Sequence, residues 1–278
     1  MLEKVNNFFG HMGNHFIDKI YESIQNDALK QMLILRSGGD QYGISAEVWK
    51  AVNAILGTTK TIGIALVTTF FLMYMFDLAS KEQITIESLI KALIQLIISV
   101  TLISNLEMII NTILSIGDYL LSSFVSNLND PNMESHKSGA ELIDSWLADG
   151  KDTGVTIWIQ CILIWLISKI AMVACYFAII SRTFELGWRV AFAPIAVSNC
   201  FEGGMNSPAI KYLKSIAGVA ISGVAMLLIM TIGFNVALKL LIANESEGPG
   251  GLLLGAAAML ATAGATIGIG AKVKEVFI

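Results

Sequence analysis

Three charged residues interrupt long apolar stretches of this chain, and they are the first candidates for chemistry. Lys60, Glu107 and Lys169 each fall within a run of apolar residues long enough to cross a bilayer. A charge in lipid costs about 2.5–3.5 kcal/mol on insertion scales, so each needs a partner or a wet cavity. We expect these intramembrane charges to form a buried ion pair or, for a lysine, to extend to the membrane surface; the alternative is that they line a polar conduit.

Two of these charges are expected at similar depths. Lys60 and Glu107 would lie about 13 Å and about 15 Å from the same end of two successive helices. This placement predicts an ion pair between them. Lys169 is expected about 18 Å from one end of a third helix, so it either shares Glu107 or faces a water-filled cavity.

A second group of charges surrounds a short apolar run. Residues 190–201 are apolar and contain Pro194, but they are too few to cross a bilayer comfortably. We therefore expect a re-entrant or interfacial segment over residues 190–203, joined to a cytoplasmic turn. The residues of this turn and segment are Arg182, Glu185, Arg189, Pro194, Lys211 and Lys214.

Small residues recur at four-residue spacing in the last apolar stretch. The glycines are Gly251, Gly255, Gly264 and Gly268. Small residues on one helix face let two backbones approach closely, so these positions predict tight packing. The packing is expected within the bundle or between subunits of a homo-oligomer.

No catalytic constellation stands out, and we expect neither an enzyme nor a bound cofactor or metal. His11 and His15 are four residues apart, but the glutamate of a zinc-protease helix is missing between them. The glycine-rich residues 264–272 fit neither a phosphate-binding loop nor a dinucleotide fingerprint. The three cysteines lie in or beside apolar segments without CxxC spacing, which argues against a disulfide framework.

The elements that must position these residues are membrane helices. Of 278 residues, 55% are hydrophobic and only 14% are charged, and the apolar residues come in blocks. The net charge of −4 gives no broad basic surface for duplex nucleic acid. Because backbone groups in lipid must be paired internally, we expect an all-α, polytopic bundle of about five transmembrane helices. The expected spans cover residues 52–76, 92–117, 153–181, 215–238 and 250–271.

The remaining segments are expected outside the bilayer core. Apolar residues at helical spacing in the first 50 residues predict an amphipathic helix on a membrane surface, on a partner or on the bundle itself. Residues 118–152 form an expected extracytoplasmic loop. Lysine and arginine are about twofold denser in the loops that we place inside, which predicts an external N-terminus and a cytoplasmic C-terminus.

Residues 182–238 resemble the TrbL-like family. The resemblance comes from Ser181-Arg182-Thr183-Phe184-Glu185, Ala193-Pro194-Ile195-Ala196, Gly203-Gly204 and Tyr212-Leu213-Lys214, followed by a long span rich in small residues. It extends more loosely over residues 50–278 and rests on the order and spacing of several motifs. Residues 1–50 and 118–152 show no match.

The resemblance implies a platform or channel subunit of a conjugative type IV secretion system in the bacterial inner membrane. Its implied partners are the lipid bilayer, other membrane subunits and cytoplasmic ATPases, with DNA or protein as the transient substrate. The main alternative is a polytopic solute or ion transporter, which internal repeats and paired broken helices would favour. A membrane-permeabilising or immunity protein would leave the long loop and the arginine–glutamate turn unexplained.

Overall fold

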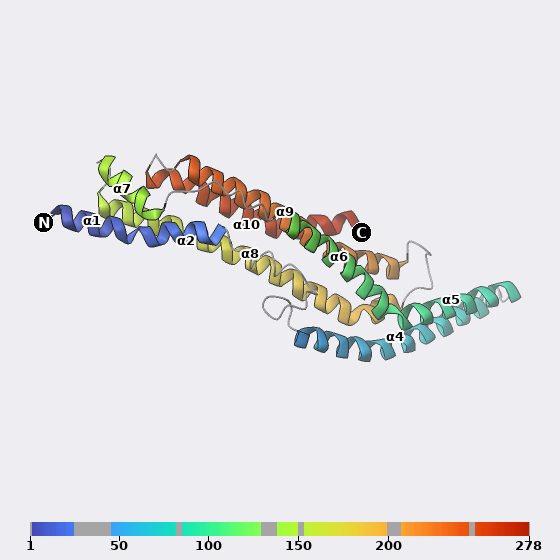
Figure 1. The fold of residues 1–278 in the computed structure, drawn as a ribbon. Coiled ribbons are helices and arrows are strands. Elements are labelled where there is room, and N and C mark those ends of the chain that lie inside the picture. Colours follow the sequence, from blue (N-terminus) through green and yellow to red (C-terminus); the bar gives the residue numbers. More distant parts are fainter. Residues whose placement is uncertain are drawn as a thin grey trace. The chain divides into compact units, whose positions relative to one another are not determined.

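The computed structural model describes residues 2–24, 46–81, 85–128, 138–149, 153–198, 207–244 and 248–277, and within these ranges the regular structure is entirely helical (Figure 1). The helices are α1 (Leu2–Met12), α2 (Asn14–Ile24), α4 (Ala46–Ser80), α5 (Ile86–Ser104), α6 (Leu106–Leu128), α7 (Gly139–Asp149), α8 (Gly154–Val197), α9 (Pro208–Ala243) and α10 (Pro249–Phe277). The chain is therefore all-α, as the sequence predicts.

Five of the described helices are long and apolar enough to cross a membrane. They cover Trp49–Ser80, Ile86–Ser104, Gly154–Val197, Pro208–Ala243 and Pro249–Val273. At about 1.5 Å per residue, even the 19-residue α5 reaches about 28 Å, close to the roughly 30 Å of a hydrocarbon core. The predicted number of spans is confirmed, and the protein is a multi-pass membrane protein.

The second span differs from the prediction, because residues 92–117 belong to two helices. Thr85 and Ser88 form a capping box that starts α5, and α5 ends at Ser104. The Asn105 side chain donates to the Thr101 carbonyl at 2.8 Å, and its backbone N–H donates to the same oxygen at 3.0 Å. Both donors of Asn105 thus bind one carbonyl near the end of α5, and Asn105 is the single residue between α5 and α6.

The expected re-entrant segment is also corrected. Residues 190–197 continue α8, which runs without a break from Gly154 to Val197 and contains Pro194. The charged residues before this segment do not interrupt the helix, because Arg189 and Glu185 form an i,i+4 ion pair along it. Residues 199–203 of the predicted segment and Cys200 lie outside the described residues.

The chain divides into two compact units. Unit 1 comprises residues 1–33, 123–180 and 225–269, and unit 2 comprises residues 34–122, 181–224 and 270–278. Helices α8, α9 and α10 each contribute residues to both units.

In unit 1 the N-terminal helices are amphipathic, as predicted, and they pack on their own chain. Helices α1 and α2 are separated at Gly13, and α2 buries Ile17, Ile20 and Tyr21. Asp18 accepts a hydrogen bond from the backbone N–H of Gly139 at 2.9 Å, which fixes α2 at the start of α7. Of the alternatives open from the sequence, the structure therefore places these helices against the bundle. The remainder of the predicted amphipathic region, residues 25–45, lies outside the described residues.

Aromatic contacts hold the same helices against α8. Phe9 lies 5.9 Å from Trp158 and Phe16 lies 5.4 Å from Trp165, measured between ring centroids. Aromatic rings attract one another electrostatically in such tilted and edge-on arrangements. This attraction adds to the stabilisation that the rings gain from apolar burial. Where the predicted loop 118–152 is described, it is largely helical, because α6 continues to Leu128 and α7 follows.

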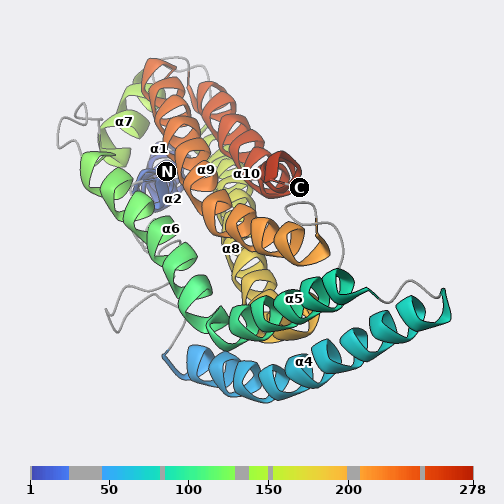
Figure 2. The ribbon, with the colours of Figure 1, turned by 90° about the vertical axis from the view of Figure 1, so that its right-hand side faces the viewer.

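Unit 2 is built around one apolar cluster contributed by α4, α5, α6, α8 and α9. Leu56, Ile103, Ile110, Val190 and Ile216 are among its buried members. Helices α4 and α5 lie side by side in both views (Figures 1 and 2). Their outer faces carry large exposed apolar side chains, and these faces suit contact with lipid. Examples are Leu72, Met73, Phe76, Ile90 and Ile97.

Candidate functional site

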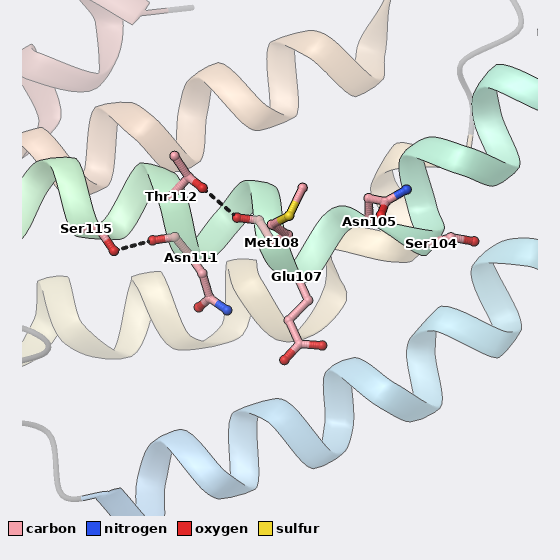
Figure 3. A pocket seen from close by; sticks show the side chains of 7 residues that line it. All are labelled: Ser104, Asn105, Glu107, Met108, Asn111, Thr112 and Ser115. Atoms are coloured by element: carbon pink, nitrogen blue, oxygen red, sulfur yellow. Dashed lines mark hydrogen bonds between the residues drawn. The ribbon is translucent and has the colours of Figure 1, made fainter.

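The most distinctive polar surface lies on α6 and begins where α5 ends. An open pocket there is lined by Ser104, Asn105, Glu107, Met108, Asn111, Thr112 and Ser115. The figure of this pocket shows Glu107 and Asn111 projecting from the side of α6 opposite to Thr112 (Figure 3). Hydroxyl, amide and carboxylate groups provide most of its polar lining, so the pocket is rich in hydrogen-bond acceptors.

Spacing explains how one helix carries both this polar face and an apolar face. Leu106, Ile110, Leu114 and Leu121 recur every four to seven residues and are buried. Because positions i, i+4 and i+7 share one side of a helix, these four residues form one apolar side of α6, and Glu107, Asn111 and Ser115 lie on another. The hydroxyls of Thr112 and Ser115 donate to carbonyls of their own helix at 2.9 Å and 2.7 Å, so they need no other acceptor.

Helix α6 lies against an apolar membrane helix. A Cβ atom added at Gly117 would lie 3.3 Å from the carbonyl oxygen of Ala220 in α9. The two backbones therefore approach closely near the middle of α6 and in the first half of α9, and α6 lies beside a helix that is apolar enough to span the membrane. The face of α6 that carries the exposed Glu107 is then a polar surface beside a membrane helix.

The predicted ion pair between Lys60 and Glu107 does not form in the structure. The Lys60 ammonium instead donates to the backbone carbonyl of Ser104 at 2.7 Å. That carbonyl belongs to the last residue of α5, where intrahelical donors run out and the helix dipole is negative. The position of the helix break, which the sequence prediction missed, therefore determines the partner of Lys60.

The third intramembrane charge belongs to unit 1. Lys169 is half-buried on α8, and its positive charge interacts with Glu22 of α2. The pKa of Glu22 lies below its usual value of 4.5, chiefly because Lys19 donates a hydrogen bond to it and adds a positive charge, with a smaller contribution from Lys169. An acidic residue in the N-terminal helices thus interacts with Lys169.

Arg182 is a buried interhelical clamp rather than a cytoplasmic turn residue. It is 3% exposed, and its guanidinium donates from Nε to the Val219 carbonyl at 3.1 Å and from Nη2 to the Ala220 carbonyl at 2.8 Å. Gly223 makes room for this group, since an added Cβ would lie 2.4 Å from Cζ of Arg182. The Asp118 carboxylate of α6 contributes a favourable electrostatic interaction with the guanidinium.

The rest of the predicted turn forms a second polar cluster. Arg189 pairs with Glu185 at 2.8 Å and donates to the Ser215 hydroxyl at 2.6 Å. The Tyr212 hydroxyl in turn donates to the Arg189 backbone carbonyl at 3.0 Å. Only 16% of the Arg189 side chain and 22% of the Glu185 side chain are exposed, so this cluster joins α8 to α9. Lys211 and Lys214, by contrast, are exposed on the first turns of α9.

Pro194 of α8 lies where the backbones of α8 and α4 approach each other closely. A Cβ added at Gly63 would lie 2.7 Å from the Pro194 carbonyl oxygen, so only glycine allows this approach. Nearby, the Thr59 hydroxyl donates to the Ala191 carbonyl at 2.7 Å. The proline is therefore part of a tight contact between α4 and α8.

The predicted packing glycines of α10 fall into two groups. A Cβ added at Gly251 would lie 2.3 Å from the Asn244 carbonyl oxygen, and one at Gly255 would lie 2.3 Å from Cγ of Leu241. These two positions pack closely, as expected. Gly264 and Gly268 are exposed, and nothing in the described part of the chain lies within 4 Å of an added Cβ.

Among the described residues, no group of three or more histidines, cysteines, aspartates or glutamates could hold a metal ion. Sequence reasoning did not single out Gly63, Gly117, Asp118 or Gly223. The i,i+4 and i,i+3 spacing of Glu107, Asn111, Ser115 and Asp118 was a usable signal for the polar face of α6.

The fold and these contacts define the class as an all-α, multi-pass membrane protein. No protein-family model, no curated protein and no solved structure matches the chain.

Proposed function

We propose that this chain is a membrane platform or channel subunit of a conjugative type IV secretion system in the bacterial inner membrane. The observation that carries the proposal is the polar face of α6 beside the apolar α9, in a protein with five apolar helices. A channel subunit needs both lipid-facing helices and a hydrophilic surface at membrane depth. The resemblance of residues 182–238 to TrbL-like proteins supplies the system to which the subunit belongs.

The partners follow from the same proposal. The exposed Lys211 and Lys214 offer positive charge to cytoplasmic ATPases or to anionic lipid headgroups. Gly264 and Gly268 form an exposed small-residue surface on α10, which suits close contact with a second copy or with another membrane subunit. DNA or protein is the proposed substrate of the assembled system.

Deletion of the gene tests this function. Transfer of the mobile element is expected to be lost while growth and solute uptake stay normal, and the intact gene supplied in trans is expected to restore transfer. Unimpaired transfer in the deletion strain would rule the proposal out.

One observation favours a second candidate, a polytopic solute or ion transporter. The α5–α6 break places a helix C-terminus beside a polar pocket, and transporters use such broken helices to hold ions. Loss of uptake of a solute in the deletion strain, with transfer unaffected, would support this candidate instead.

A further inference from the structure

We propose that the polar cluster between α8 and α9 in unit 2 binds the headgroup of an anionic phospholipid. The site combines the Arg189 guanidinium of α8 with Lys211 and Lys214 of α9, and an exposed aromatic strip beside it receives the acyl chains. This inference goes beyond the proposed function, because it assigns a lipid rather than a cytoplasmic ATPase to these lysines. It holds for a secretion-system subunit and for a transporter alike.

Arg189 is held in place and still has donors to offer. Its Nη2 pairs with the Glu185 carboxylate at 2.8 Å, and its Nη1 donates to the Ser215 hydroxyl at 2.6 Å. Its Nε has no hydrogen-bond partner among the described residues. Because a guanidinium presents five N–H donors in a rigid fork that suits phosphate oxygens, these two contacts do not exhaust it.

The two lysines extend the positive charge of this group along α9. Lys211 is exposed and Lys214 is partly exposed. Lys211 lies one helical turn from Ser215, which accepts the Arg189 hydrogen bond, and one turn from Lys214. With Glu185 as the counter-charge, three positive groups and one negative group leave a net charge of +2. The cluster therefore attracts an anion and repels a cation.

An exposed aromatic strip on α8 adjoins the guanidinium. Phe184, Trp188 and Phe192 are 68%, 52% and 48% exposed, and their four-residue spacing places them on one side of the helix. Cζ of Arg189 lies 5.4 Å from the centroid of the Trp188 ring. A cationic group thus borders directly on an apolar surface, and a phospholipid joins a phosphate to acyl chains in the same way. Indole rings are also enriched at the headgroup level of membranes.

Two contacts with α4 fix the level of this cluster in unit 2. A Cβ added at Gly187 would lie 3.6 Å from Cγ2 of Val52, and the Thr59 hydroxyl donates to the Ala191 carbonyl at 2.7 Å. Arg189 falls between the two contacts on α8. It is therefore level with the part of α4 between Val52 and Thr59.

The surface of α4 changes character next to this level. Between the two contacts it is mixed, and its exposed side chains include Asn53, Ile55 and Thr58. Further along it becomes predominantly apolar, with large exposed side chains at Ile62, Leu72, Met73 and Phe76. Headgroups lie where a polar surface gives way to an apolar one, so the cluster is at the level that a lipid phosphate occupies.

Thermal unfolding of the purified full chain in a mild detergent tests the site. Phosphatidylglycerol is added to the protein at increasing concentration, and phosphatidylcholine is the lipid without net charge. Glycerol 3-phosphate supplies the same phosphate chemistry without acyl chains. The variant Lys211→Gln/Lys214→Gln removes two charges at the site, and Lys239→Gln/Lys272→Gln removes two exposed lysines elsewhere as the matched control.

Phosphatidylglycerol should raise the melting temperature in a saturable way, because a ligand that binds only the folded state stabilises it. Phosphatidylcholine and glycerol 3-phosphate should not do so at the same concentrations. Each basic residue near an anionic headgroup contributes about a fivefold change in affinity, so Lys211→Gln/Lys214→Gln should weaken the effect by about 25-fold. The control variant should behave as the wild type, and high salt should weaken binding to the wild type.

The guanidinium is tested separately by Arg189→Lys. This variant keeps the positive charge but loses the planar fork, so it should bind phosphatidylglycerol more weakly than the wild type does. Equal affinity in Arg189→Lys and the wild type would overturn the assignment of the phosphate to Arg189.

Three further results would overturn the proposal. Equal stabilisation by glycerol 3-phosphate would show a site for a free phosphate. Equal weakening by the two double variants would show a general effect of charge. No stabilisation by phosphatidylglycerol would leave the lysines to a protein partner such as an ATPase. Because all of these measurements use purified protein, none of them depends on whether gene deletion abolishes transfer.

Discussion

Removing the buried guanidinium of Arg182 should destabilise the contact between α8 and α9 by an amount that depends on the replacement. Arg182→Ala removes two charge-assisted hydrogen bonds to the Val219 and Ala220 carbonyls. Such bonds contribute about 1.5–3 kcal/mol each in soluble proteins, whereas interhelical bonds in one membrane protein average about 0.6 kcal/mol. We therefore expect a loss of about 3 kcal/mol, which is roughly a hundredfold change in the folding equilibrium.

Arg182→Met distinguishes the contribution of the buried charge to stability from the contribution of the side-chain volume. It removes both hydrogen bonds but also removes the desolvation cost of a buried charge, and it keeps most of the side-chain volume. Replacing buried charged groups with apolar residues of similar size is often neutral or stabilising. Arg182→Met should therefore cost clearly less than Arg182→Ala, and the difference reports the cavity that alanine leaves.

Gly223 supplies an independent test of the same contact. A methyl group at this position would lie 2.4 Å from Cζ of Arg182, so Gly223→Ala must displace the guanidinium. Overpacking of this kind costs about 1–3 kcal/mol. In the Arg182→Ala background the clash with the guanidinium is absent, and Gly223→Ala should be neutral or stabilising by up to about 1 kcal/mol, because alanine favours the helix. Gly57→Ala is the matched control, since no atom lies within 4 Å of its added Cβ.

The assay is thermal unfolding in a mild detergent, with the folded fraction measured by size exclusion after heating. The single and double variants form a mutant cycle, and residues in contact typically show a coupling of at least about 0.5 kcal/mol. If Gly223→Ala destabilises the wild type and the Arg182→Ala variant equally, the two effects are additive. That result would refute the proposed contact between Arg182 and Gly223.

Three further outcomes are expected. Gly63→Ala should lower the melting temperature, at a cost of about 1–3 kcal/mol, because its Cβ would meet the Pro194 carbonyl oxygen at 2.7 Å; an unchanged melting temperature would contradict that approach. Gly255→Ala should destabilise the detergent-solubilised protein, whereas Gly264→Ala, which meets nothing within 4 Å, should not, and equal effects would argue against the packing of α9 on α10. The Glu22 pKa is lowered from 4.5, so the stability difference between the wild type and Glu22→Gln should be present above pH 4.5 and disappear as the pH falls through the lower, folded-state pKa; a pH-independent difference in melting would contradict this.

The sequence predicted the five apolar helices because their signal is local. Length, lack of charge and block-like hydrophobicity are properties of consecutive residues, and lipid demands a helix wherever they occur. The amphipathic nature of α1 and α2 was equally readable from residue spacing. The sequence left open whether these two helices lie on a membrane or pack on their own bundle. The answer depends on the positions of α7 and α8, which no local sequence pattern predicts.

The sequence predictions that failed concerned partners on other helices. Arg182 looks like a turn residue until the Val219 and Ala220 carbonyls are seen to accept its hydrogen bonds. Likewise, hydropathy alone predicts one span across residues 92–117, whereas α5 ends before Asn105. The Asn105 side chain donates a hydrogen bond to a carbonyl near the end of α5, and a single side chain can interrupt a helix in this way. Hydropathy is averaged over many residues and does not register a hydrogen bond made by one side chain. The ends of the helices were therefore less predictable than the existence of the spans.

The contrast between the α4–α5 pair and α6 has a consequence for biogenesis. Helices α4 and α5 expose apolar side chains over most of their surface, so they can enter the bilayer as a hairpin as soon as they leave the ribosome. Helix α6 follows immediately in the chain but carries Glu107 and Asp118, and its neighbours Arg182 and Ala220 have not yet been synthesised. The residues of α8 and α9 that contact Asp118 and Gly117 of α6 therefore become available only after up to about a hundred more residues have been synthesised.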